Sequence, residues 1–157
     1  MKLLFKQRLF SWWSSYDIFD VAGRVVYRVQ GKPALGHKLH ILDAQDQHVA
    51  TLKGGPVFFT ATFDLFIGEE QIGYVHKHFT FFKPKFTVKL DKYWELDGSV
   101  WEWDYLIRDI QGNVVAEITK EIFHLTDTYV MDIADECDAL KVLMVVLAID
   151  AEKASRQ

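Results

Sequence analysis

The residues of this chain that could bind a charged ligand include lysines spaced for one face of a β-strand. Lys83, Lys85 and Lys89 stand at even spacings with Thr87 among them, so an extended strand places all four on one side. Ammonium groups near an anionic lipid surface attract it by about 1 kcal/mol each. The spacing predicts a site for anionic head groups. The same pattern is also typical of a solvated strand face or of a sheet edge protected by lysine.

Two arginines extend this candidate site. The stretch "RVVYRVQGK" alternates, which places Arg24 and Arg28 on the face opposite Val25 and Val29. Lys77 and Lys92 are further candidates for the same surface. Their place in one site depends on the strand order, which the sequence leaves open.

The sequence offers little for catalysis or metal binding. His76 and His78 put two imidazoles on one strand face, but no cysteine or carboxylate stands beside them at a ligand spacing. Cys137 is the only cysteine, and we interpret it as structural. The motifs GxSxG, GxGxxG and HExxH and the P-loop are absent. We expect no catalytic residue, no metal and no cofactor, with an enzyme as a remote alternative.

Length and composition indicate one domain over residues 1–157. Half of the residues are hydrophobic and 15% are aromatic, which suffices for a sizeable core. One cysteine permits no internal disulfide and fits a reducing compartment. Lys6 and Arg8 interrupt the apolar N-terminus, and no apolar run reaches the roughly 18 residues of a membrane helix. We therefore expect a cytoplasmic protein without a transmembrane segment.

The formal net charge of −4 is unevenly distributed along the chain. Residues 1–92 carry a net charge of +5 and residues 93–157 a net charge of −9. This asymmetry is typical of a basic binding face on an acidic protein. The alternative, which we take as the expectation, is that strands from both halves interleave in space and the charges mix.

Most of the chain predicts short strands joined by tight turns. The expected turns are Asp43–Asp46, Gly68–Glu70, Asp97–Gly98 and Gln111–Asn113. Residues 41–53 also align without gaps on residues 107–119, with an aspartate, a glutamine and three apolar positions in common. Shared turn chemistry and two related halves of one β-architecture both explain this echo.

The stretch "DALKVLMVVLAID", residues 138–150, predicts a buried helix. Its apolar part would rise about 16 Å as a helix, too little for the roughly 30 Å hydrocarbon core of a bilayer. Asp135 suits the N-cap, so we expect a helix over about residues 135–150. Because nearly every face of this helix is apolar, the surrounding β-structure must enclose it, as a closed barrel does.

Three stretches together resemble the LURP-one-related family. "KQRLFSWWSSYDIFDVAGRVVYRVQGK" is similar to the family's opening, "LHILDAQDQHVATLK" to its second hairpin, and "DALKVLMVVLAID" to its C-terminal helix. The resemblance implies a tubby-like fold, a closed antiparallel barrel of about 12 strands around a hydrophobic helix. That fold agrees with the separate argument from the buried helix.

The resemblance also bears on function. Tubby domains of the same fold bind phosphoinositides through basic residues, whereas the cysteine-rich and calcium-binding segments of the related scramblases are absent here. We expect a non-enzymatic module that binds anionic phospholipid head groups at the cytoplasmic membrane surface. The expected site residues are Lys83, Lys85, Lys89, Arg24 and Arg28.

The alternative function is a protein-interaction scaffold. It would use exposed aromatic side chains such as Trp12, Trp13, Trp94 and Trp101 to contact a partner protein. We expect no nucleic-acid partner in either case.

Overall fold

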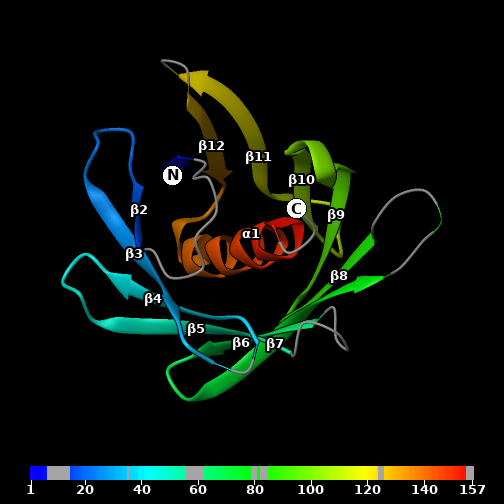
Figure 1. The fold of residues 1–157 in the computed structure, drawn as a ribbon. Helices are drawn as coiled ribbons and strands as arrows, with labels where there is room; N and C mark the ends of the chain where they lie inside the picture. The colour runs from blue at the N-terminus through cyan, green and yellow to red at the C-terminus, as the bar shows by residue number, and fades with distance from the viewer. Residues whose placement is uncertain are drawn as a thin grey trace.

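The computed structural model describes residues 1–6, 15–34, 36–55, 62–78, 81, 85–123 and 126–154. In this part of the chain, twelve strands form a closed barrel around a C-terminal helix (Figure 1). The strands are β1 (Lys2–Lys6), β2 (Tyr16–Phe19), β3 (Val25–Lys32), β4 (Lys38–Asp43), β5 (His48–Gly54), β6 (Thr62–Ile67), β7 (Glu70–His78), β8 (Lys85–Lys89), β9 (Tyr93–Ser99), β10 (Asp104–Asp109), β11 (Val114–Phe123) and β12 (Thr126–Ile133).

The strand order follows the sequence around the whole ring. Each strand pairs antiparallel with its neighbours along the chain, and β1 closes the barrel between β12 and β2. Consequently β2–β8 form one continuous side of the barrel and β9–β12 the other. The expectation that strands of the two halves interleave was wrong, because hairpin connections keep consecutive strands adjacent.

The helix α1 (Ala139–Ala154) runs inside this ring. A 3₁₀ turn, η2 (Glu136–Asp138), precedes it, and the carboxylate of Asp135 accepts a hydrogen bond of 2.9 Å from the Cys137 amide. The helix therefore begins later than the predicted residue 135. It also continues past residue 150, because the alanine, glutamate and lysine that follow are good helix formers.

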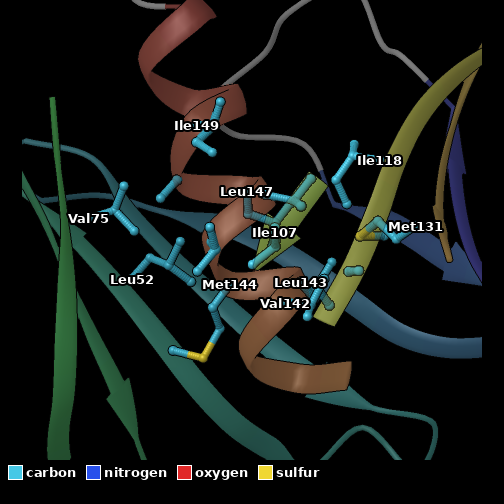
Figure 2. Close-up of a cluster of buried hydrophobic side chains, with 14 of the residues drawn as sticks. Leu52, Val75, Ile107, Ile118, Met131, Val142, Leu143, Met144, Leu147 and Ile149 are labelled. Atoms are coloured by element: carbon cyan, nitrogen blue, oxygen red, sulfur yellow. The ribbon is translucent and has the colours of Figure 1, made fainter. Parts of the chain in front are cut away.

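The helix is buried on every side. All residues from Val142 to Ile149 are at most 1% exposed. Figure 2 shows side chains of the surrounding strands pointing toward the helix. The labelled strand residues are Leu52, Val75, Ile107, Ile118 and Met131. Burial of each aliphatic side chain contributes about 1.5–3 kcal/mol to the free energy of folding. The contact between α1 and the surrounding strands therefore forms the core of the protein.

Three hairpins share one turn built on an aspartate. The Oδ1 atoms of Asp20, Asp43 and Asp109 each accept hydrogen bonds of 2.9 Å from the amides two and four residues later. The predicted turns at Asp43–Asp46 and Gln111–Asn113 are thereby confirmed. The residue three positions after each aspartate has a positive φ, between 60° and 85°, which favours glycine. Gly23 and Gly112 occupy this position in two of the turns, and Asp46 has the same backbone conformation in the third.

This shared turn accounts for part of the internal echo. The echoing hairpins, β4–β5 and β10–β11, lie six positions apart in the ring. If the barrel were two related halves, β2–β3 would correspond to β8–β9 in the same way. However, β2–β3 is closed by the aspartate turn. The β8–β9 connection has a different turn, in which the Leu90 amide donates to the Lys92 carbonyl. The matching aspartates therefore reflect turn chemistry.

The predicted turn at Asp97–Gly98 was wrong. Both residues lie within β9, and the chain turns at η1 (Val100–Glu102) and Trp103, whose φ is 58°. Gly98 stands opposite Tyr105, where a Cβ atom would lie 2.7 Å from the Asp104 carbonyl oxygen. Glycine at this position thus permits close approach of two strands.

Val145→Asp should prevent folding, because it places an unpaired carboxylate on the enclosed helix at a cost of several kcal/mol. Val21→Asp is the matched control, since Val21 is 73% exposed in the β2–β3 turn. The measurement is soluble yield and the circular-dichroism melting curve of both variants. Wild-type melting of Val145→Asp would contradict the enclosed position of the helix.

Candidate functional site

The lysine row on β8 faces outward. Lys85 and Lys89 are exposed, while Val88 between them points into the core and is 1% exposed. The alternation predicted from the sequence is therefore present in this strand. Lys83 lies outside the described residues.

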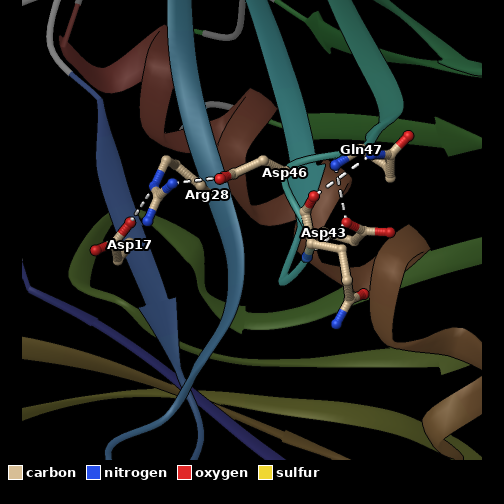
Figure 3. A network of polar contacts seen from close by, with 6 residues as sticks. Asp17, Arg28, Asp43, Asp46 and Gln47 are labelled. Carbon is tan, nitrogen blue, oxygen red and sulfur yellow. Dashed lines mark hydrogen bonds and ion pairs between the residues drawn. The ribbon is translucent and has the colours of Figure 1, made fainter.

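The two arginines lie on another part of the barrel surface. Arg28 on β3 forms ion pairs with Asp17, at 2.9 Å, and with Asp46 (Figure 3). Arg24 pairs with Asp20 at 2.8 Å. Because β4–β7 separate β3 from β8, the structure does not join these arginines and the β8 lysines in one patch. Their carboxylate partners also offset their charge.

Lys77 points into the barrel, so it does not join the outer lysines. Its side chain is 2% exposed, and its Nζ atom lies 3.2 Å from the Glu152 Oε1 atom of α1. The same Nζ atom lies 5.4 Å from the centroid of the Trp101 ring. The sequence analysis assigned Lys77 to the surface because it is charged. Strand alternation instead puts it on the same side as the buried Val75.

Further ionisable groups lie near this end of α1. The Lys153 ammonium donates a 2.9 Å hydrogen bond to the Trp101 carbonyl oxygen and lies 4.1 Å from the Trp103 ring centroid. Burial lowers the pKa of Lys153 to about 8, against the opposing charge of Asp150. Burial likewise raises the pKa of Asp150 to about 6. Both shifts disfavour the charged forms, because this end of the barrel largely encloses the two groups.

A cluster of basic side chains that the sequence analysis missed lies on the outer face of β3, β4 and β5. Lys32, Lys38 and Lys53 stand directly opposite one another across these three strands. Next to them the rings of His40 and His48 stack, with centroids 4.0 Å apart and an interplanar angle of 13°. We call these five residues the β3–β5 basic cluster.

Positive charge dominates the cluster. Among the described residues, no aspartate or glutamate forms an ion pair with its three lysines, although Asp64 on β6 stands opposite Lys53. Like charges directly opposite each other on a sheet are destabilising. Burial, together with the positive charges of His48 and the three lysines, lowers the pKa of His40 to about 4. The arrangement therefore suits an anionic ligand better than an empty surface.

The sequence carries only part of the signal for this cluster. The turn predicted at Asp43–Asp46 indicates the hairpin, but counting back from it would pair Lys38 with Leu52. A β-bulge between Ile41 and Leu42 shifts the register by one residue and brings Lys38 opposite Lys53. The position of Lys32 depends on the β3–β4 pairing, across a connection with no comparable turn signal.

The histidine pair on β7 makes contacts to threonines. His76 hydrogen-bonds with Thr62, and His78 with Thr87. In the part of the chain that the structure describes, no three histidine, cysteine or acidic side chains are grouped for a metal ion. Cys137 is exposed, and its hydrogen bond to Asp135 and the nearby acidic charge raise the pKa of its thiol, which opposes nucleophilic activation.

The tryptophans expected at a protein interface differ in how exposed their side chains are. Trp94 is 4% exposed and belongs to the core, so its predicted exposure was wrong. Val88 pairs with it across β8 and β9, and the inward alternation of β9 explains its burial. Trp101 is 45% exposed. Trp12 and Trp13 lie outside the described residues.

A twelve-stranded antiparallel barrel closed around a hydrophobic C-terminal helix is the tubby-like fold. A sequence model of the LURP-one-related family matches residues 1–150, and the chain belongs to this family. The resemblance seen in the sequence is thereby confirmed.

Two known proteins are similar to the chain over nearly its whole length. The uncharacterized protein YxjI of Bacillus subtilis (strain 168) is 26% identical over 151 residues, which cover 96% of this chain and 92% of YxjI. The X-ray structure of a protein from Arabidopsis thaliana matches with a TM-score of 0.64 at 16% identity, covering 95% of this chain and 90% of that one. The second likeness shows the fold alone.

None of the helices among the described residues has the length and apolar character needed to cross a membrane.

Glu152→Gln should lower the free energy of unfolding by about 3 kcal/mol, because it removes the carboxylate charge beside the buried Lys77 ammonium. Lys77→Met combined with Glu152→Met should recover most of this loss, since an apolar pair replaces the buried charges. Urea unfolding followed by fluorescence measures both.

The control is Lys141→Met, which removes an ion pair with Asp91 at 2.9 Å whose aspartate side chain is 57% exposed. Its expected cost is below about 1 kcal/mol. Equal losses in Glu152→Gln and Lys141→Met would show that the inner pair is not effectively buried.

Proposed function

We propose that this protein is a non-enzymatic module that binds anionic phospholipid head groups at the cytoplasmic membrane surface through the basic side of its barrel, strands β3–β8. The supporting observation is the strand order, which keeps the basic and acidic halves of the chain on different sides. A protein with a net charge of −4 can approach an anionic surface only if its positive charge is segregated.

The charges of the two sides support this orientation. Residues 25–89, which span β3–β8, carry eight Lys and Arg against five Asp and Glu. Residues 93–133, which span β9–β12, carry two against nine. On the basic side Lys38, Lys53, Lys85 and Lys89 lie on the outer face, and at about 1 kcal/mol per lysine near the surface they suffice for reversible binding.

The expected site differs from the one predicted from the sequence. Lys85 and Lys89 remain in it, while Arg24 and Arg28 contribute less because carboxylates pair with them. The β3–β5 basic cluster replaces them as the second group of positive charges.

The test is co-sedimentation of the full chain with vesicles. We expect binding to vesicles that contain phosphatidylglycerol, cardiolipin or phosphoinositide, little binding to neutral phosphatidylcholine, and weaker binding at physiological than at low salt. Lys38→Glu, Lys53→Glu, Lys85→Glu and Lys89→Glu together should reduce binding at least tenfold.

The matched control reverses two lysines outside β3–β8 that already have carboxylate partners, with Lys2→Glu and Lys141→Glu. It should bind at least half as well as wild type, and its circular-dichroism spectrum checks the fold. Absence of binding to every anionic vesicle would exclude the proposal, and equal losses in both sets would exclude the named side.

A further inference from the structure

We propose that the β3–β5 basic cluster is a binding site for a phosphomonoester group and that binding is coupled to uptake of a proton by His40. This inference rests on the proposed function only where the phosphate belongs to a lipid. A soluble phosphate ester presents the same chemistry, and the experiment below separates the two sources.

The lysine geometry suits one compact dianion. Residues directly opposite each other on antiparallel strands have Cβ atoms about 4.5–5.5 Å apart. Lys38 is the middle member of the row, opposite both Lys32 and Lys53. The Lys53 ammonium lies 4.9 Å from the Phe66 ring centroid on β6, so its flexible side chain must turn toward β4 for the three ammonium groups to converge. A phosphomonoester carries up to two negative charges and three acceptor oxygens, which matches three ammonium donors better than a singly charged diester does.

The stacked imidazoles add a group that can change its charge. The His48 Nε2 atom lies 3.0 Å from the Ala50 carbonyl oxygen and 2.8 Å from the Thr51 hydroxyl. Because a carbonyl oxygen only accepts, this Nε2 carries the hydrogen, and its contacts hold the His48 ring in place against His40. His40 lies in contact with this ring and opposite Thr51 on the neighbouring strand.

The charged groups that face the stack are mainly positive. They come from β3 (Arg28 and Lys32), β4 (Lys38) and β5 (Lys53). Carboxylates also lie on the neighbouring strands and turns. Asp17 and Asp46 pair with Arg28. Asp64, opposite Lys53, accepts a hydrogen bond from the neutral Gln71 amide and keeps its negative charge.

These surroundings predict how proton uptake depends on the ligand. Without an anion, burial and the neighbouring positive charges hold the pKa of His40 at about 4, so the His40 ring is neutral near pH 7. A bound dianion reverses the local field and raises the pKa of His40. A ligand that raises a pKa binds more tightly as the pH falls toward the raised value, so affinity should increase from pH 7.5 to pH 5.5.

The first arm of the test uses inorganic sulfate, whose charge does not change in this pH range. NMR of the histidine ring signals in the full chain follows the titration of His40 with sulfate and with chloride at equal ionic strength. We expect sulfate to raise the apparent pKa of His40 from about 4 to about 6.5, which by linkage makes sulfate bind about tenfold more tightly at pH 5.5 than at pH 7.5.

Variants separate the roles of the residues. His40→Gln should retain sulfate affinity at pH 7.5 and lose most of its increase at pH 5.5, whereas Lys38→Gln with Lys53→Gln should lose binding at both. His76→Gln, which alters a histidine on β7, is the control and should behave as wild type. An unchanged His40 titration in saturating sulfate, or sulfate binding without pH dependence, would overturn the coupling.

The second arm identifies the source of the phosphate. Inositol 1,4,5-trisphosphate in solution is compared with vesicles that carry phosphatidylinositol 4,5-bisphosphate. Binding of both, lost in the Lys38→Gln and Lys53→Gln variant, supports a lipid ligand. Binding of the soluble ester alone supports the site and excludes the membrane function. Vesicle binding that leaves the histidine titration unchanged excludes this site and retains the proposed function.

Discussion

Enclosure of α1 is the constraint on which the rest of the structure depends. The helix is apolar from Val142 to Ile149 without a polar face, so no single layer of sheet could bury it. A closed barrel surrounds it, and each of the twelve described strands is thereby paired on both sides. The helix also fills the interior with aliphatic side chains, which directs the search for a ligand site to the outer surface and the ends of the barrel.

The way the barrel closes determines how charge is distributed over that surface. A ring of hairpins preserves the order of the sequence, so a difference in charge between two halves of the chain becomes a difference between two sides of the molecule. Within the basic side, the register of β3, β4 and β5 brings Lys32, Lys38 and Lys53 into line. Aligned like charges reduce stability, and a function in binding anions would account for their retention.

The sequence predicted the features that depend on local chemistry or on strong periodicity. The apolar run after Asp135 indicated an enclosed helix, and the aspartates at positions 43 and 109 indicated turns that the structure contains. The helix boundaries differ by four residues, because a 3₁₀ turn occupies the start and favourable residues prolong the end.

Features that depend on non-local pairing were predicted less well. Asp97–Gly98 has the composition of a hairpin turn, yet Gly98 serves a close approach between β9 and β10. Lys77 and Trp94 were assigned to the surface, although their strand faces point inward. The β3–β5 basic cluster was missed because three lysines and two histidines distributed over 22 residues become neighbours only through the register of three strands.

The central claim is that one side of the barrel faces an anionic membrane. Electron paramagnetic resonance tests it most directly, with a nitroxide attached at His78→Cys on β7 or at Glu117→Cys on β11, each with Cys137→Ser. On vesicles containing phosphatidylglycerol, the label on β7 should lose access to an aqueous nickel chelate, and the label on β11 should keep it. Shielding of the β11 label alone, or equal access of both labels on vesicle-bound protein, would contradict the claim.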